Sequence, residues 1–163
     1  MMITAAKLRE VLHYDPSTGH FTWRIPRPRV RVGARAGTLH HRGYRHIEIG
    51  GRAYAEHRLA WLYVTGRWPK DQIDHCNRQR ADNRFDNLRE ATNAQNRANS
   101  KHANRTGYKG VRFMPWMRTK PFGAQITVNR KVRWLGSFTT AEEAHQAYVK
   151  AAGEVFGNFA HGG

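Results

Sequence analysis

The stretch that decides the fold reads Ile73-Asp74-His75-Cys76-Asn77, and a polar turn carries the chain on to Asn87-Leu88-Arg89 and then to residues 93–99. We expect two short extended segments, followed by a helix that returns beneath them. Adjacent residues of a strand point to opposite faces, so Asp74 and His75 are poorly explained as parts of one core surface. Instead, we expect a carboxylate, an amide oxygen and an imidazole to converge in this stretch.

The order, spacing and flanking residues of this stretch resemble the HNH, or ββα-metal, nuclease family, in its phage and intron homing-endonuclease branch, over about residues 57–99. The resemblance implies that Asp74 binds a metal ion together with Asn96 from the helix. It also implies that His75 is the general base that activates water, and that Asn87 fixes the hairpin loop. An isolated asparagine in such a turn also caps the loop, so both interpretations of Asn87 agree.

Some residues near the motif depart from the family pattern, and others have two possible structural interpretations. Cys76 replaces a more usual aliphatic residue, and no zinc-binding cysteine pairs accompany the motif, so we expect no zinc ribbon. The apolar run that begins near His57 favours a structural histidine there over a phosphate contact. Four arginines are either a solvated face or phosphate contacts: Arg78, Arg80, Arg84 and Arg89.

The chemistry that the resemblance implies is hydrolysis of a phosphodiester bond. A histidine with its ordinary pKa of about 6.5 is a suitable general base at neutral pH. A hard divalent ion bound by carboxylate and amide oxygens would neutralise the phosphate and help the 3′ oxygen to depart. Mg²⁺ is expected there, and Mn²⁺ fits the same donors. Two protein oxygens would hold the ion weakly, so we expect DNA to complete the site.

The composition indicates a polyanionic partner. The chain has 163 residues with 28 Lys+Arg against 12 Asp+Glu, which gives a formal net charge of +16, and the sequence pI is near 11.0. Such a charge is typical of a protein that binds nucleic acid. The single cysteine excludes an internal disulfide and a four-thiolate zinc site. Because no apolar stretch is long enough to cross a bilayer and no signal pattern is present, we expect a cytoplasmic protein without a membrane partner.

The pattern of apolar runs and breakers predicts an α+β protein. Near the N-terminus it indicates a helix, then an extended basic arm at residues 24–35 and a β-hairpin around Gly50-Gly51. The arm either contacts DNA or is only solvated. The expected parts are residues 1–56 with these elements, residues 57–99 with the HNH motif, a linker at residues 100–106, and a second domain at residues 107–163.

The second domain resembles the Apetala-type, or ethylene-response-factor, DNA-binding domain over about residues 107–159. The likeness rests on Gly110-Val111-Arg112, Gly123-Ala124-Gln125-Ile126 and Trp134-Leu135-Gly136-Ser137-Phe138. It implies a three-stranded antiparallel sheet packed on one helix, with the exposed face of the sheet in the major groove of DNA. Simple packing on the helix is the alternative for Trp134. The residues expected on or beside the exposed face are Arg112, Arg118, Gln125, Arg130, Arg133 and Trp134.

Together these observations predict a metal-dependent DNA endonuclease whose C-terminal module positions double-stranded DNA. It would act as a monomer or a DNA-induced dimer, with no protein partner implied. A DNA-binding regulator without catalysis and a basic RNA-binding protein are the alternatives, but neither has a use for Asp74, His75 and Asn96 together. The sequence leaves open whether one or both strands are cut, and a homing role follows from the resemblance alone.

Overall fold

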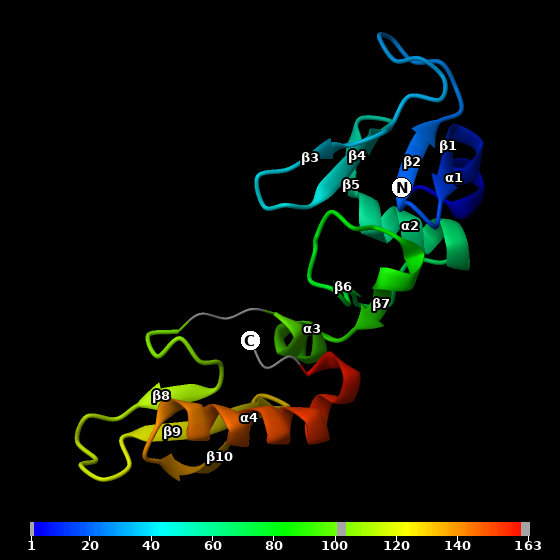
Figure 1. The fold of residues 1–163 in the computed structure, drawn as a ribbon. Helices are drawn as coiled ribbons and strands as arrows, with labels where there is room; N and C mark the ends of the chain where they lie inside the picture. Colours follow the sequence, from blue (N-terminus) through cyan, green and yellow to red (C-terminus); the bar gives the residue numbers. More distant parts are fainter. Residues whose placement is uncertain (1, 101–103, 161–163) are drawn as a thin grey trace. The chain divides into compact units, whose positions relative to one another are not determined.

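The computed structural model describes residues 2–100 and 104–160, and the chain divides into two compact units, Met1–Ala91 and Thr92–Gly163 (Figure 1). The division comes directly after the hairpin that carries Asp74, which is earlier in the chain than the expected linker. Residues 101–103 of that linker lie outside the described residues. The boundaries expected at residues 56, 99 and 106 stay predictions.

The first unit opens with a short helix and a hairpin. α1 (Ala5–Val11) begins after Thr4, whose hydroxyl accepts a hydrogen bond from Lys7 N at 3.2 Å. Such a cap satisfies a backbone N–H that has no partner within the helix. β1 (Leu12–Asp15) and β2 (His20–Trp23) then pair antiparallel. The predicted helix is confirmed, although it ends at Val11 because the next residues pair as a strand.

A three-stranded antiparallel sheet and a second helix follow. The sheet contains β3 (Thr38–Leu39), β4 (Arg45–Ile49) and β5 (Arg52–Ala55), and Gly50-Gly51 makes the turn between β4 and β5. α2 (Glu56–Thr65) ends at Gly66, whose φ of 76° is in the left-handed region that glycine adopts easily. The predicted hairpin is confirmed, and the apolar run that begins near His57 forms α2.

The basic arm at residues 24–35 has local structure of its own. Arg27 and Val30 form an isolated antiparallel bridge, and the Arg27 guanidinium lies 4.1 Å from the centre of the Trp23 ring. Arg27 Nη1 also donates to Glu48 O at 2.9 Å. The arm is therefore anchored to the first unit at Arg27, whereas the sequence predicted a simply extended segment.

The hairpin that carries Asp74 and His75 closes the first unit. β6 (Gln72–His75) pairs antiparallel with β7 (Leu88–Ala91), and the short helix η1 (Phe85–Asn87) precedes β7. The hairpin has no separate core, because its buried residues Ile73 and Leu88 join the apolar cluster of the N-terminal elements. That cluster includes Leu8, Leu12, Phe21, Ile47, Leu59 and Leu62.

The second unit combines a short helix, a sheet and a long helix. α3 (Asn93–Asn99) comes first, and β8 (Val111–Phe113), β9 (Phe122–Val128) and β10 (Lys131–Phe138) form an antiparallel sheet in the order β10-β9-β8. α4 (Ala141–Phe156) packs on one face of this sheet, and η2 (Gly157–Phe159) follows it. The predicted sheet with one packed helix is confirmed.

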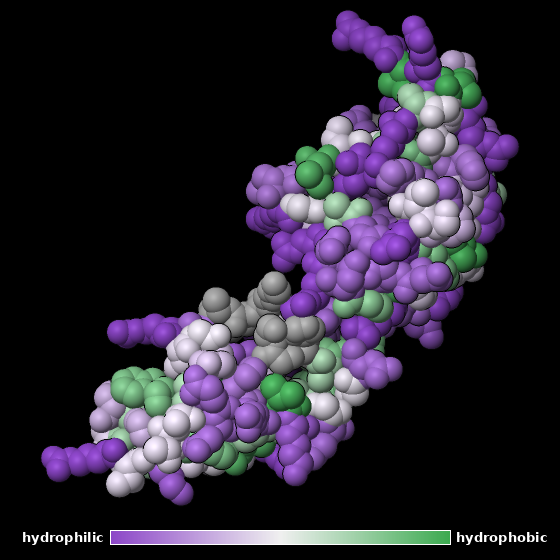
Figure 2. All heavy atoms as spheres, viewed as in Figure 1, coloured by the Kyte–Doolittle hydropathy of each residue, from purple (hydrophilic) through white to green (hydrophobic). Residues whose placement is uncertain are grey.

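The fold class is mixed α and β with small antiparallel sheets, as predicted. The ββα-metal arrangement stays a prediction, because β6 and β7 belong to the first unit and α3 belongs to the second. Among the described residues, no helix is long and apolar enough to cross a membrane. Figure 2 shows hydrophilic residues over most of the visible face of each unit.

Candidate active site and nucleic-acid interface

Asp74 and His75 are neighbours at the end of β6, and each is only 4% exposed. Asp74 lies opposite Arg89 of β7, whose Nε and Nη2 donate to Asp74 Oδ2 at 2.9 and 2.8 Å. A buried carboxylate without such a partner would be costly. Arg89, one of the arginines considered for phosphate contact, therefore binds a carboxylate within its own hairpin.

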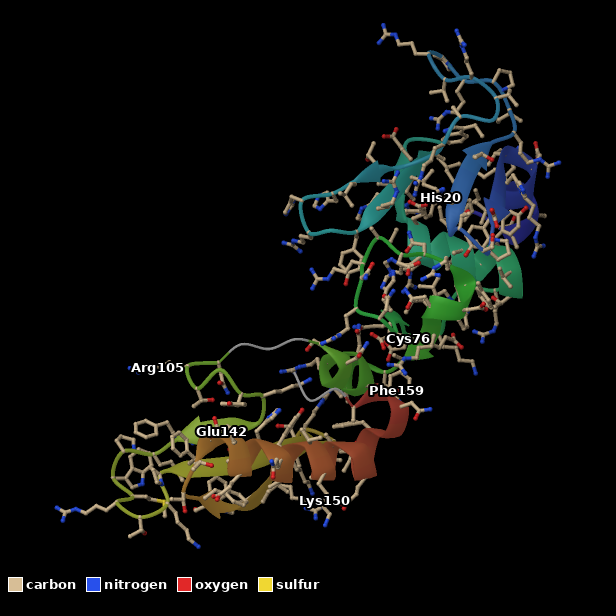
Figure 3. The ribbon with its side chains drawn as sticks, in the orientation of Figure 1. His20, Cys76, Arg105, Glu142, Lys150 and Phe159 are labelled. Atoms are coloured by element: carbon tan, nitrogen blue, oxygen red, sulfur yellow. The ribbon has the colours of Figure 1, made fainter. Side chains whose placement is uncertain are left out.

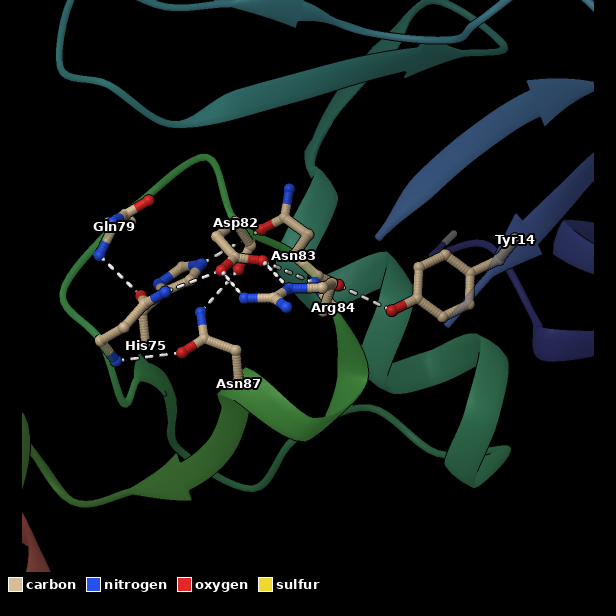
Figure 4. Close-up of polar contacts among 8 residues, drawn as sticks. Tyr14, His75, Gln79, Asp82, Asn83, Arg84 and Asn87 are labelled. Atoms are coloured by element: carbon tan, nitrogen blue, oxygen red, sulfur yellow. Dashed lines mark hydrogen bonds and ion pairs between the residues drawn. The ribbon is translucent and has the colours of Figure 1, made fainter. Parts of the chain in front are cut away.

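The His75 ring is held by polar and aromatic side chains. Its Nε2 lies 3.1 Å from Oδ1 of Asn83 (Figure 4), and the His57 ring meets it edge-on with centroids 5.2 Å apart. Burial lowers the pKa of His75, and the hydrogen bond to Asn83 and the charge of Asp74 oppose this effect. The neutral imidazole therefore prevails at neutral pH, and this is the form that can accept a proton.

His57 belongs to the first turn of α2, and its ring lies beside that of His75. Burial lowers the pKa of His57 to about 3, and the charges of His75 and Arg58 act in the same direction. The centroid of its ring is 5.3 Å from that of Tyr44. A buried ring that stays neutral in this way fits the structural histidine that the sequence favours.

A loop joins β6 to β7, and Asn87 ties its two arms together (Figure 4). Asn87 Oδ1 accepts from Asn77 N at 3.0 Å, and Asn87 Nδ2 donates to Asp82 O at 2.8 Å. The backbone adds a bond from Cys76 N to Asn87 O at 2.9 Å. One asparagine side chain thus fixes the loop that follows His75.

The arginines of this loop have different partners. Arg84 binds Asp82 through Nε and Nη2 at 2.9 and 2.7 Å, and this pairing lowers the pKa of Asp82 to about 2. Arg80 Nη1 donates to Arg42 O at 2.9 Å. Both side chains stay exposed, whereas Arg78 is half-buried with a left-handed backbone at φ 63°. Arg80 and Arg84 therefore present charge at the surface close to His75 in the chain.

The described residues contain no group of three His, Cys, Asp or Glu side chains that could hold a metal ion. Asp74 offers a carboxylate from the first unit. Asn96 belongs to α3 in the second unit, where Thr92 and Gln95 form a capping box at the start of the helix. The implied ligand pair therefore stays a prediction.

Lys109 fastens α3 within the second unit. The Lys109 ammonium group is buried and donates to the carbonyl oxygens of Ala98 and Ser100, the latter at 2.8 Å. These carbonyls lie at the C-terminal end of α3, where the helix has no partners of its own for them and a positive charge is favourable. This contact is one reason why α3 belongs to the second unit.

The open face of the second unit's sheet, opposite α4, is the candidate nucleic-acid interface. Side chains packed toward α4 alternate along the strands with Arg112 and Gln125, which therefore point to the open face. Trp134 pairs with Gln125 and is 48% exposed. A Cβ at Gly123 would overlap the Trp134 ring. The indole therefore covers the sheet at Gly123 instead of packing on α4.

Three expected contact residues lie away from the open face. Arg133 pairs with Ile126, which is buried in the cluster beneath α4, so alternation directs Arg133 to the helix side. Arg130 lies in the turn between β9 and β10 with φ 65°, and Arg118 lies in the loop between β8 and β9. All three are exposed, so their predicted contacts depend on how DNA passes the edges of the sheet.

A cavity of about 520 Å³ opens beside the edge strand β8. Arg105 (Figure 3) and Arg112 supply its charge, and Phe113 and Phe122 supply ring surfaces. The two phenylalanine rings pack with centroids 5.3 Å apart. Of the residues on the open face, Arg112 also lines this cavity.

Two buried polar residues were not predicted to belong to the site: Asn83, which contacts His75, and Glu56, which binds Arg45. Asn83 is 1% exposed and Glu56 is fully buried. Asn83 stands in a run of polar loop residues, and Glu56 stands at the start of a helix, where an acidic residue usually faces solvent. Neither burial is visible in the sequence, because each depends on contacts with residues far away in the chain.

Residues 54–98 match a family model described as HNH endonuclease. This stretch is similar to HNH endonuclease domains. The chain is also 38% identical over 73 residues to the ethylene-responsive transcription factor ERF117 of Arabidopsis thaliana, and the alignment covers 44% of this chain and 21% of that relative. The chain thus spans about a fifth of the relative's length. No solved structure matches the chain. The two resemblances seen in the sequence, to HNH nucleases and to ethylene-response factors, are confirmed.

Proposed function

We propose that the protein is a metal-dependent endonuclease that hydrolyses phosphodiester bonds in double-stranded DNA, with His75 as general base. The observation that carries this proposal is the buried imidazole of His75, next to Asp74 in the chain, within the stretch that matches HNH endonucleases. A homing role of the phage or intron type rests on the resemblance of the motif alone.

In this proposal His75 takes a proton from the water that attacks phosphorus, which makes the water a stronger nucleophile. Positioned proton transfer of this kind accelerates reactions by about 10²- to 10⁴-fold. Asn87 keeps the loop after His75 in place through its bonds to Asn77 and Asp82. Arg80 and Arg84 are exposed on that loop and are available to meet the DNA backbone.

The proposed metal ligands are Asp74 and Asn96, and their chemistry fits a hard cation. Both supply oxygen donors, which Mg²⁺ and Mn²⁺ prefer. Asp74 is buried and already pairs with a cation, the Arg89 guanidinium, so its surroundings accommodate a positive charge. When bound, such an ion supplies charge neutralisation on the phosphate and assistance to the departing 3′ oxygen.

The second unit would position the DNA. Arg112, Gln125 and Trp134 share the open face of its sheet, and arginine can bind guanine O6 and N7 together through its fork of donors. The match to a transcription factor covers 44% of the chain. Because two binding regions on one chain convert the second contact into an intramolecular one, weak individual contacts suffice.

A second candidate function is DNA binding without cleavage. The observation that favours it is the bond from Arg89 to Asp74, which occupies one oxygen of the proposed metal ligand. The nuclease proposal requires that this oxygen or its neighbour become available to the ion when DNA binds.

A plasmid cleavage assay separates the two functions. Supercoiled DNA is incubated with the protein and Mg²⁺, Mn²⁺ or EDTA, alongside His75→Ala and the control His13→Ala, which replaces an exposed histidine of β1. We expect metal-dependent product from the wild type and from the control, but not from His75→Ala. Open-circle product means a nickase, and linear product means paired cuts. Intact, protein-bound DNA under every condition would overturn the nuclease proposal.

A further inference from the structure

A buried carboxylate lies near the HNH hairpin without belonging to it. Glu56 is the first residue of α2, and its side chain is fully buried. Arg45 of β4 donates from Nε to Glu56 Oε2 at 2.9 Å, and Arg35 Nη2 lies 4.0 Å from Oε1. Arg45 is itself held, because its Nη2 donates to Gly37 O at 2.7 Å. Two arginines therefore compensate for the charge of Glu56 inside the first unit.

Asn83 stands between this carboxylate and the imidazole of His75. Its Oδ1 lies 3.1 Å from His75 Nε2. Its buried Nδ2 and the buried Oε1 of Glu56 have no hydrogen-bond partner of standard geometry. Burial raises the pKa of Glu56, and Arg45, Arg35 and the side chain of Asn83 act against this rise, which indicates that the Asn83 amide is near the carboxylate. The amide thus has the imidazole on its carbonyl side and the carboxylate near its NH₂ side.

The backbone of Asn83 is fixed by the β1–β2 hairpin. The Tyr14 hydroxyl donates to Asn83 O at 2.6 Å (Figure 4), and this bond is buried. Gly19 lies so close that a Cβ at that position would overlap the backbone of Asn83 and Arg84. Because its main chain is held in this way, the side-chain amide of Asn83 has one remaining choice, which is the direction in which its two ends point.

The hydrogen-bonding properties of the amide decide which of its two ends faces His75. The carbonyl end of an amide only accepts hydrogen bonds, the NH₂ end only donates them, and a carboxylate only accepts. A flipped Asn83 would place its carbonyl oxygen against the Glu56 carboxylate, where two acceptors repel. Its carbonyl must therefore face His75, and Nε2 of His75 must carry the hydrogen. A neutral imidazole with hydrogen on Nε2 has its lone pair on Nδ1.

We propose that Glu56, held by Arg45, orients the Asn83 amide and thereby fixes His75 as the Nε2–H tautomer, so that Nδ1 is the nitrogen that accepts the proton from water. Asn83 and Glu56 are positioning residues, since they act through His75. Only the final step, proton acceptance from water, rests on the proposed nuclease function. The tautomer itself is a property of the protein without DNA or metal.

The tautomer is measured by long-range ¹H–¹⁵N NMR on protein labelled at histidine nitrogen, at about pH 8, where His75 is neutral. The His75 signals are assigned by their loss in His75→Ala. We expect a protonated, pyrrole-type Nε2 and a pyridine-type Nδ1 in the wild type. Hydrogen on Nδ1 in the wild type would overturn the proposal, and this test needs no other variant to fold.

Two substitutions test whether Glu56 acts on His75 through Asn83. Glu56→Gln removes the carboxylate that requires a donor, and Asn83→Ala removes the acceptor. We expect each to give a mixture of the two His75 tautomers. The control Glu48→Gln, which changes an exposed acid of β4, should keep the wild-type tautomer. A single, unchanged tautomer in folded Glu56→Gln and Asn83→Ala proteins would show that neither residue sets it.

Cleavage kinetics test whether Glu56 and Asn83 also affect catalysis by His75. We expect Glu56→Gln and Asn83→Ala to lower the single-turnover rate constant of cleavage by about 10- to 100-fold. This loss is a part of the 10²- to 10⁴-fold that a positioned base supplies. DNA affinity should stay within twofold of that of the wild type. Equal losses of affinity and rate would indicate general damage to the fold and overturn the positioning role. If the wild-type protein never cuts DNA, the nuclease proposal fails, and the NMR result still decides the tautomer.

Discussion

Two arginines of the first unit and one of the second have opposite uses. In the first unit, Arg45 and Arg89 bind the buried carboxylates of Glu56 and Asp74. In the second unit, Arg112 is exposed on the open face of a sheet, beside Gln125 and Trp134. The difference teaches that the net charge of the chain serves two purposes. Paired arginines hold side chains in place around His75, and exposed arginines are available to meet a polyanion.

Replacing one arginine of each unit with alanine tests this difference, and Arg89 is the one chosen in the first unit. Arg89→Ala removes the guanidinium from a carboxylate that is 4% exposed. Breaking a buried ion pair costs about 3–5 kcal/mol, and the low end applies because the Arg89 side chain is 21% exposed. We expect a loss of about 3 kcal/mol in the free energy of unfolding of the first unit, measured by urea denaturation. A loss below about 0.5 kcal/mol would mean that the pair does not support the hairpin.

A glycine pair tests the packing of the second unit independently of charge. Gly110 and Gly107 both have left-handed backbones, with φ of 78° and 76°, but a Cβ overlaps the Tyr148 ring only at position 110. We expect Gly110→Ala to destabilise the second unit by about 1–3 kcal/mol more than Gly107→Ala, because overpacking adds to the shared backbone strain. Calorimetry of both variants measures this difference. Equal shifts in the melting temperature would contradict the tight contact between Gly110 and Tyr148.

Arg112→Ala is the counterpart of Arg89→Ala on the open face. We expect the stability of the second unit to change by less than about 0.5 kcal/mol, since the side chain is exposed. DNA affinity should fall, and if Arg112 meets a phosphate, the slope of log K against log salt should become shallower by about 0.9. Titrations of labelled duplex DNA at several salt concentrations measure both. Wild-type affinity and slope would remove Arg112 from the interface.

A surface ion pair of the first unit gives the smallest effect. Arg67 binds Glu90 at 2.7 Å through two parallel bonds and, with Lys70 N, lowers the pKa of Glu90 from 4.5 to about 2. A lowered carboxyl pKa contributes stability above pH 4.5 that is lost as the pH falls toward 2. We therefore expect Glu90→Gln to reduce stability slightly at pH 7 and to make it less dependent on pH in this window. Parallel stability curves for the two proteins would show that the pair contributes nothing.

Tight turns and the ends of helices were predictable, because the residues that determine them are adjacent in the sequence. Gly50-Gly51 marks the β4–β5 turn, Gly66 ends α2, and Thr140 with Glu143 starts α4 through a capping box. The order of Asp74 and His75 on one strand, with Asn87 before the next, also followed from the motif. The open-face positions of Arg112 and Gln125 follow from alternation once the strands are known.

Long-range contacts were not predictable from these signals. Asp74 pairs with Arg89 only because the loop between them sets the strand register, and the length of a polar loop does not fix a register. Asn83 contacts His75 from eight residues further along the chain, and Glu56 lies near Asn83 only because of the way α2 packs in the first unit. Lys109 bonds to carbonyl oxygens at the end of α3, and no local signal in the sequence indicates this contact within the second unit.

The close contact between Gly19 and Asn83 has a consequence for exchanging parts between proteins. The family match begins at residue 54, yet the loop after His75 rests on a hairpin formed by residues 12–23. A graft of residues 54–98 onto a foreign scaffold would leave Tyr14 and Gly19 behind and expose the apolar side of β6 and β7. The smallest transplantable piece therefore starts near Thr4 and extends through α3, which carries the proposed ligand Asn96, about twice the length that the motif suggests.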